Sequence, residues 1–189
     1  RIRGSHCTTK NVKAETLEMR YQDNIYYVHV NSDGTGYSSY QLAMFYVDGK
    51  LAYCIEPGLA IYSTKYDVGG WDVTSLSSEQ RKKIELIGYY GYEYPTHQGN
   101  VKYYMAAQEL IWKVAKPLSA TWSTQKRGGG QIINIEAEKD EIERLISNHS
   151  TKPDFNNKTI NGVIGDTITL VDSNNVLSEF SVYDASSNE

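Results

Sequence analysis

Two residues in this chain have side chains suited to covalent chemistry, and the first is a cysteine. Cys54 lies at the end of an apolar and aromatic stretch, just before the turn Glu56-Pro57-Gly58. Its thiolate would be a competent nucleophile, although a strand cysteine is also commonly a small buried hydrophobic side chain. Cys7 is the only other cysteine of the sequence. Two cysteines are too few for a disulfide-built scaffold, but a Cys7–Cys54 bridge would abolish any thiol chemistry.

The second residue is Gln108, a primary amide in apolar surroundings. It lies on the apolar stripe of a predicted helix, whose neighbouring members are Tyr104, Met105, Ile111 and Trp112. The donors and the acceptor of a buried amide all need partners, so a glutamine is unusual at such a position. The alternative is a half-exposed side chain that bonds to neighbouring backbone groups.

The first third of the chain has strand patterns, and the predicted strands must position Cys54. Residues 12–30 have the β-branched and aromatic character of extended structure. The clearest local signal is a hairpin whose two strands are residues 42–47 and 50–55. Its turn, Asp48-Gly49, tolerates the positive φ angles of a type I′ turn. Cys54 is therefore expected near the end of a strand.

Helical periodicity takes over in the middle of the chain and positions Gln108. A capping box over residues 77–80 begins the first predicted helix, which ends before Pro95. The spacing of apolar residues predicts a second helix over about 101–115 and a third over about 135–148. The second of these helices carries Gln108.

The chain then returns to strand patterns, with a second hairpin predicted over residues 167–171 and 176–183. Strands, helices and strands in this order predict an α+β fold, in which a sheet or sandwich-like part built from N- and C-terminal strands carries an inserted helical lobe. Residues 1–8 resemble a tail with a cloning scar, and residues 9–189 are expected to form a single domain. Within it, we expect strands at about 12–60 and 158–184 and the helical lobe at about 75–150.

Composition excludes several classes of function. The chain has 189 residues, of which 40% are hydrophobic and 22% are charged, as in an ordinary globular domain. A net charge of −4 offers no broad basic surface for nucleic acid, and no apolar run is long enough to insert into a membrane. Because histidines and cysteines lack the spacing of a metal site, we expect no metal and no cofactor.

Two short motifs resemble those of a known family. Tyr53-Cys54-Ile55-Glu56-Pro57-Gly58 is similar to the cysteine motif of the thioester domains of Gram-positive surface adhesins, and Ala107-Gln108-Glu109-Leu110-Ile111-Trp112 is similar to their glutamine motif. The family often has threonine before the glutamine, where this chain has Ala107. Residues 165–170 and 176–178 resemble the closing strands of the family, so the resemblance spans most of residues 12–184.

The resemblance implies an internal bond from the sulfur of Cys54 to the side-chain carbonyl of Gln108. The thiolate would attack the amide carbon and release ammonia, provided that the fold positions the pair and stabilises the oxyanion. Because water hydrolyses thioesters, aromatic side chains are expected to shield the bond, and Glu56 is a candidate for polarising an incoming amine. The shielding candidates are Tyr53, Tyr104 and Trp112. A simpler interpretation is that these are ordinary core aromatics beside a solvated carboxylate.

The function implied by the resemblance is covalent adhesion. A lysine amine of a host cell-surface or extracellular-matrix protein would attack the acyl carbon of residue 108, which leaves an amide and a free Cys54 thiol. Small amines would do the same in vitro. Such a monomeric module reacts once and is not a turnover enzyme. The resemblance also implies an extracellular, virulence-associated protein that is anchored to the cell wall through parts outside this sequence.

Two rival functions are compatible with the same residues. A cysteine hydrolase or transglutaminase-like enzyme needs a histidine near Cys54, and the candidates are His29 and His97. Neither lies in a local catalytic signature. A purely non-covalent adhesive domain is the other alternative, in which Cys54 has no chemical role.

Overall fold

The computed structural model describes residues 2–3, 14–31, 34–57, 65–68 and 74–180. The chain divides into two compact units, Arg1–Glu143 and Arg144–Glu189. The first unit combines a curled antiparallel sheet with helices, as the predicted α+β class requires. Cys7 lies outside the described residues, as do residues 12–13 of the first predicted strand and residues 181–183 of the last one.

The sheet is organised around one long strand, β2, and its neighbours in space follow the order β1-β5-β2-β3-β4, with β6 also paired to β2. All of its pairings are antiparallel. The register of β2 with β3 shifts between Tyr21 and Tyr26, and Asn24 in this interval has a φ of 57°. Such a bulge bends a strand and increases its twist. The bounds of the strands are Ile2–Arg3 (β1), Ala14–Val30 (β2), Gly36–Val47 (β3), Lys50–Ala52 (β4), Lys65–Val68 (β5) and Ser119–Ser123 (β6).

The predicted Asp48-Gly49 hairpin is confirmed as the β3–β4 connection. Asp48 and Gly49 have φ angles of 48° and 79°, as a type I′ turn requires. The Asp48 carboxylate also accepts a hydrogen bond from the backbone N–H of Thr16 on β2, at 3.1 Å. The second strand ends at Ala52 rather than at Ile55. It stops early because the backbone of Cys54 bonds to a helix side chain instead of a neighbouring strand.

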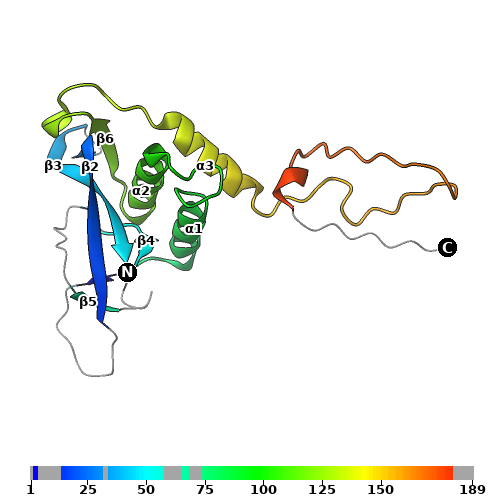
Figure 1. Cartoon of the computed structure of the whole chain (residues 1–189), viewed down its shortest axis with the longest axis horizontal. Helices are drawn as coiled ribbons and strands as arrows, with labels where there is room; N and C mark the ends of the chain where they lie inside the picture. Colours follow the sequence, from blue (N-terminus) through cyan, green and yellow to red (C-terminus); the bar gives the residue numbers. More distant parts are fainter. Residues whose placement is uncertain (1, 4–13, 32–33, 58–64, 69–73, 181–189) are drawn as a thin grey trace. The chain divides into compact units, whose positions relative to one another are not determined.

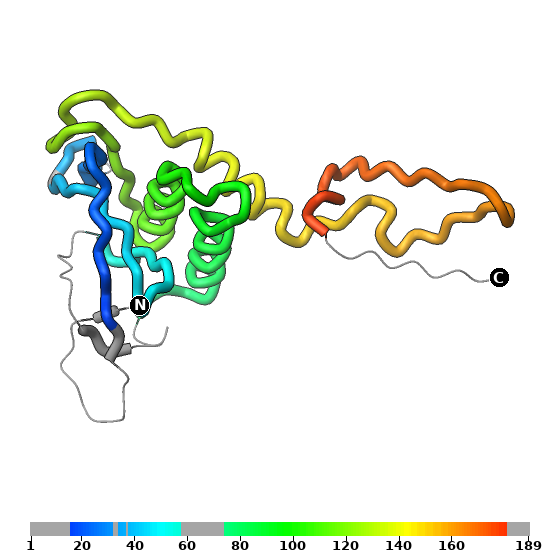
Figure 2. Tube along the Cα trace, in the orientation of Figure 1, coloured from blue at the N-terminus to red at the C-terminus, as the bar shows by residue number. Residues whose placement is uncertain are grey.

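Three α-helices follow the predicted positions: α1 (Ser78–Tyr89), α2 (Val101–Ala115) and α3 (Glu136–Asn148). Ser77 and Gln80 form the predicted capping box of α1, and Asn100 caps α2. Among the described residues, short 3₁₀ turns occur at Lys126–Gly128 (η2) and Leu177–Glu179 (η3). Figure 1 shows α2 against the sheet and α1 beside α2, and the Cα trace in Figure 2 follows the same arrangement. None of the described helices is long and apolar enough to cross a membrane.

Strand β6 was missed, because the sequence pattern predicted no strand between the second and the third helix. Its five residues pair with β2 from Tyr26 to Val30 and so extend the sheet beside α2. A strand this short carries too few alternating positions to stand out, and its stability comes from pairing with a long neighbour. It brings Trp122, which is 2% exposed, into the core beneath α2.

The second predicted hairpin is wrong within the described residues. Residues 151–180 contain the 3₁₀ turn η3 but no strand. The apolar residues that suggested the strand at 167–171 remain in solvent, with Ile168 49%, Leu170 43% and Val171 78% exposed, whereas Val176 of the second predicted strand is buried without strand pairing. An alternating pattern becomes a strand only where another surface covers its apolar face. The predicted turn at residues 172–175 does form, because the Asp172 carboxylate accepts hydrogen bonds from the backbone N–H groups of residues 174, 176 and 177.

Candidate functional site

Cys54 and Gln108 are 54 residues apart in sequence and are joined by two hydrogen bonds. The backbone N–H of Cys54 donates to Oε1 of Gln108 at 2.8 Å, and Nε2 of Gln108 donates to the backbone carbonyl of Cys54 at 2.7 Å. Gln108 is 1% exposed, so the partners that a buried amide needs are supplied by the cysteine itself. The two bonds fix the plane of the amide beside the residue that carries the sulfur.

The thiol of Cys54 is half-buried and free, and its S–H donates to the backbone carbonyl of Glu56 at 3.4 Å. Burial raises the pKa of this thiol, and the nearby Glu56 carboxylate adds to the rise. A backbone hydrogen bond with Glu56 and the indole of Trp112 act in the opposite direction and lower this pKa. At neutral pH, Cys54 is therefore held mainly as a protonated thiol, and it must lose this proton before it can act as a nucleophile.

The hydrogen bond to Oε1 has a chemical consequence. When a nucleophile attacks the side-chain carbonyl of Gln108, negative charge develops on this oxygen. The backbone N–H of Cys54 already points at it from 2.8 Å, which is the distance expected of an oxyanion donor. The pair can therefore position an acyl group and stabilise the charge that forms on it.

Tyr104 connects the helix that carries Gln108 to the strands that lead to Cys54. It is fully buried on α2, one turn before Gln108. Its hydroxyl donates to the backbone carbonyl of Ala52 at 3.0 Å and accepts from the backbone N–H of Phe45 at 3.2 Å. Burial raises the pKa of this phenol well above its usual range, so it stays protonated. Tyr104 thus holds α2 against β3 and β4.

Tyr53, the residue before Cys54, stacks on Tyr104 with ring centroids 4.8 Å apart. Its hydroxyl accepts a hydrogen bond from the backbone N–H of Tyr92 at 3.2 Å, which ties the loop after α1 to the site. Gly91 leaves the space that this ring needs, because a Cβ atom there would lie 2.6 Å from the Tyr53 hydroxyl and 2.9 Å from Cβ of Ala107. The Tyr53 ring therefore packs between the helices next to the thiol.

Trp112 lies one turn after Gln108 on α2 and is 2% exposed. Its ring contacts Tyr27 and His29 of β2, with centroid distances of 5.1 and 4.6 Å. It also stacks on Trp122 of β6 with an interplanar angle of 9°. All three predicted shielding residues are therefore aromatic side chains around the Cys54–Gln108 pair. Glu56, the fourth predicted residue, contributes its backbone carbonyl and is half-buried.

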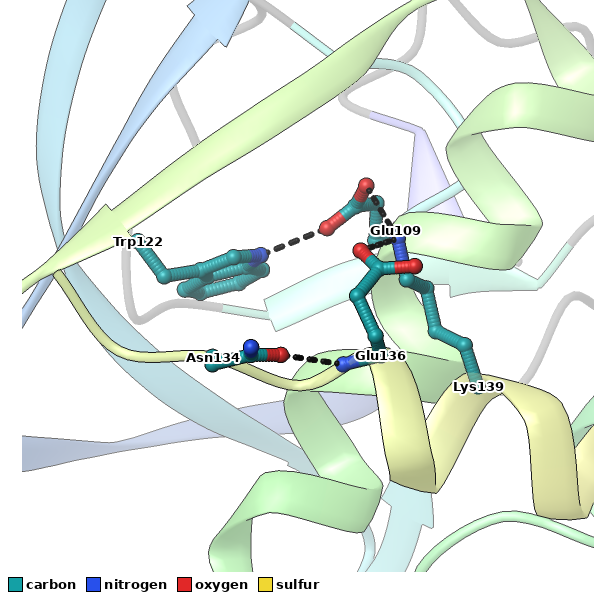
Figure 3. Close-up of polar contacts among 5 residues, drawn as sticks. All are labelled: Glu109, Trp122, Asn134, Glu136 and Lys139. Atoms are coloured by element: carbon teal, nitrogen blue, oxygen red, sulfur yellow. Dashed lines mark hydrogen bonds and ion pairs between the residues drawn. The ribbon is translucent and has the colours of Figure 1, made fainter.

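Glu109 was missed by the sequence interpretation, although it lies next to Gln108. It is 5% exposed, and its carboxylate accepts from the indole N–H of Trp122 at 2.7 Å and pairs with Lys139 of α3 at 3.2 Å (Figure 3). Lys139 also pairs with Glu136 at 2.6 Å. A charged residue between apolar neighbours on a helix could have flagged this position, but its partners lie on elements that only the fold brings together.

The rival enzyme interpretation depends on a histidine at the thiol. Burial lowers the pKa of His29, whose ring contacts Trp112. His97 is 1% exposed and turns its Nδ1 toward the backbone carbonyls of Tyr90 and Gly91, at 2.9 and 3.1 Å. The groups that shift the pKa of the thiol are Glu56 and Trp112 together with burial, rather than an imidazole. Among the described residues, no cluster of three histidine, cysteine or acidic side chains could hold a metal ion.

The model of the thioester domain family matches residues 51–162, which is more than half of the chain and includes both Cys54 and Gln108. The chain belongs to the thioester domain family. No curated protein matches this thioester domain. Its fold is similar to that of a solved structure, the thioester domain of the Staphylococcus aureus TIE protein, with a TM-score of 0.57 and 24% sequence identity. The likeness covers 76% of this chain and 58% of that one, and at this identity it shows the fold alone.

Proposed function

We propose that Cys54 and Gln108 form an internal thioester and that the domain uses it to attach covalently to an amine on a host surface protein. The observation that carries this proposal is the reciprocal pair of hydrogen bonds between the Cys54 backbone and the Gln108 side-chain amide, at 2.8 and 2.7 Å. Membership of the thioester domain family supports it independently.

The first step is formation of the bond. The Cys54 thiolate attacks the amide carbon of Gln108, the C–S bond forms, and the C–N bond breaks. Nitrogen leaves as ammonia after it takes up the proton that the thiol lost. An unactivated amide resists such attack, but pairing the reactants in a near-attack geometry contributes about 7–11 kcal/mol toward the barrier. The Cys54 N–H that points at Oε1 stabilises the developing oxyanion.

Protection of the bond is the task of the aromatic side chains. Tyr104 and Trp112 are 0% and 2% exposed, and Tyr53 stacks on Tyr104 beside the thiol. These rings cover the acyl group with apolar area. The half-buried Cys54 leaves an approach for a slender nucleophile such as a lysine side chain.

The second step is capture of the partner. The amine attacks the acyl carbon of residue 108, the new amide forms, and Cys54 is released as a thiol. The partner class is a host cell-surface or extracellular-matrix protein with an accessible lysine, and the module is displayed outside the cell on a wall-anchored protein. Non-covalent complexes dissociate within milliseconds to days, whereas an amide link has no comparable dissociation step. Such a link suits adhesion under mechanical load.

Reaction once per molecule makes this a reactive binding module and not a turnover enzyme. The hydrolase or transglutaminase alternative predicts many turnovers on an amide substrate and requires an imidazole that acts on Cys54. The non-covalent alternative predicts that Cys54→Ala retains the partner equally well after denaturation. The family and the contacts of Cys54 favour the thioester over both alternatives.

The test is capture of a labelled primary amine, such as biotin-cadaverine, by the folded protein, followed by denaturation and peptide mapping. The proposal expects one label per molecule, located at residue 108, and none on Cys54→Ala or Gln108→Ala. Label on several residues, or labelling that survives loss of Cys54, would overturn it. A product that accumulates beyond one equivalent would favour the enzyme alternative.

A further inference from the structure

The indole N–H of Trp112 is a buried donor that the mechanism above does not use. Its Nε1 atom is inaccessible to solvent and makes no hydrogen bond within the part of the chain that the structure describes. A buried tryptophan N–H ordinarily finds a partner, because leaving it without one costs about 1–3 kcal/mol. By contrast, the neighbouring Trp122 has Glu109 as its acceptor, at 2.7 Å. Because this donor lies beside the reactive pair, we expect an acceptor that forms only during the reaction.

The position of this donor is fixed by its surroundings. Trp112 lies one helical turn after Gln108, and its ring is held by the rings of Tyr27, His29 and Trp122. Its indole lies close enough to the Cys54 thiol to lower the pKa of that group, although no hydrogen bond joins them in this structure. Catalytic hydrogen bonds are often long in a resting state and shorten only as charge develops.

Negative charge on the sulfur of Cys54 is opposed mainly by burial. Among the described residues, the S–H donates to the backbone carbonyl of Glu56, an acceptor that suits the neutral thiol and not a thiolate. The Glu56 carboxylate likewise disfavours negative charge on the sulfur. The Cys54 N–H serves Oε1 of Gln108, so the oxyanion already has its donor. A further donor at the sulfur would offset the effect of burial when charge develops there, and the indole of Trp112 acts in that direction.

We propose that Trp112 donates its indole N–H to the sulfur of Cys54 when the carbon–sulfur bond breaks, and so acts as a catalytic residue of the amine-capture step. This inference rests on the proposed thioester function. Trp112 then stabilises the leaving thiolate in addition to shielding the thioester from water.

In the capture step, the lone pair of a neutral amine attacks the acyl carbon of residue 108. The carbonyl electrons move to the oxygen, and the Cys54 N–H donates a hydrogen bond to the oxyanion that results. When the carbonyl re-forms, the C–S electron pair leaves with the sulfur, and the indole N–H of Trp112 donates to this thiolate. The attacking nitrogen then loses a proton and the thiolate gains one, which leaves an amide and a thiol. The same donor assists the thiolate during formation of the thioester.

The test replaces Trp112 with β-(3-benzothienyl)alanine, which keeps the shape of the indole but has sulfur in place of the N–H. The first readout is the rate at which methylamine opens the thioester, followed by intact mass. The second is the pH midpoint for alkylation of Cys54 in a Gln108→Ala background, which requires no thioester. We expect the rate to fall at least about tenfold, since a hydrogen bond to a charged group is lost, and the alkylation midpoint to rise.

The matched control is the same replacement at Trp122, whose N–H goes to Glu109 and not to the sulfur. This control is expected to leave both the rate and the midpoint unchanged. If the replacement at residue 112 leaves both readouts as in the wild-type protein, or if the replacement at residue 122 changes them equally, the inference is wrong although the thioester stands. If the mass of the wild-type protein reveals no thioester, the proposed function itself is wrong, and the inference falls with it.

Discussion

Cys54 combines two properties that oppose each other in a nucleophile. Its backbone holds the Gln108 amide in place from both sides, whereas its sulfur is kept protonated by burial and by the neighbouring Glu56. The amide is thus positioned before the thiol ionises, so the rate of the proposed thioester formation would depend on the small fraction of thiolate. The ring of Tyr53 also has a fixed place, because only a residue without a Cβ atom at position 91 leaves room for its hydroxyl.

The raised pKa of Cys54 gives a prediction for the unreacted thiol, which Gln108→Ala preserves. Because the folded protein binds this proton more tightly than the unfolded chain, the associated stability is present below the ordinary cysteine pKa of about 8.5 and is lost as pH rises through the folded value. Urea unfolding of Gln108→Ala should therefore show stability falling above this pH more steeply than in Gln108→Ala with Cys54→Ala. Parallel pH profiles of the two proteins would show that the pKa of the thiol is not raised.

Replacement of Gly91 tests the cover over the site. In Gly91→Ala, the new methyl group would lie 2.6 Å from the Tyr53 hydroxyl, so the ring must shift, and overpacking of this kind costs about 1–3 kcal/mol. We expect faster hydrolysis of the thioester, measured as recovery of a free thiol over time. The control is Gly88→Ala, whose methyl group meets Tyr53 only at an ordinary 4.0 Å. Equal hydrolysis rates in the two variants would contradict the shielding role of Tyr53.

Among the secondary-structure elements, α2 positions the Gln108 amide for the proposed reaction. Tyr104 bonds it to β3 and β4, Glu109 bonds it to β6 and α3, and the side chain of Gln80 on α1 donates to the backbone carbonyl of Val114 at 2.9 Å. Parts of β3, β4, β6, α3 and α1 are thus fastened to the helix that carries Gln108.

The pairing of Lys139 with Glu109 gives a prediction at this scale. Burial would lower the pKa of Lys139, but the carboxylates of Glu136 and Glu109 raise it, so its ammonium group is held charged. In Lys139→Met the buried Glu109 carboxylate keeps only Trp122, and breaking a buried pair in this way costs about 3–5 kcal/mol. The matched control is Lys83→Met, which breaks the more exposed, half-buried pair with Glu143 and is expected to cost about 0–1 kcal/mol. Similar losses in urea unfolding of the two variants would contradict a structural role for the Glu109 network.

The elements also explain how far the sequence could predict the site. The Asp48-Gly49 turn and the capping box at Ser77 are local signals, and both elements form where they were expected. Gln108 could be singled out from the sequence because it is a polar residue on the apolar stripe of its own helix. Glu109 and Trp122 could not be paired in advance, because β6 is recognisable only from its pairing with β2. The strand predicted at residues 167–171 failed for the converse reason, since its apolar face has no covering surface among the described residues.

At the scale of the molecule, the proposed thioester is a cross-link as well as a reactive group. It would join the segment after β4 to α2 and close a loop of 54 residues. Restricting the unfolded chain in this way stabilises a fold by about 4 kcal/mol in the chain-entropy model used for disulfides. The bond would thus contribute to the stability of the domain until an amine opens it.

This cross-link predicts that methylamine lowers the melting temperature of the wild-type protein. The adduct keeps the covalent change at residue 108 but opens the loop, so the melting temperature should fall by several degrees or more. Cys54→Ala, which has no loop to open, should melt at the same temperature with and without methylamine. An unchanged melting temperature for the wild-type adduct would mean that the bond does not constrain the unfolded chain.

The most direct test of the Cys54–Gln108 thioester is the intact mass of the freshly purified wild-type protein beside that of Cys54→Ser. The thioester predicts that the wild-type mass is lower than the sequence mass by one ammonia, that methylamine raises it by one methylamine, and that Cys54→Ser has its full sequence mass and does not react. A folded wild-type protein with the full sequence mass that is inert to methylamine would contradict the Cys54–Gln108 thioester.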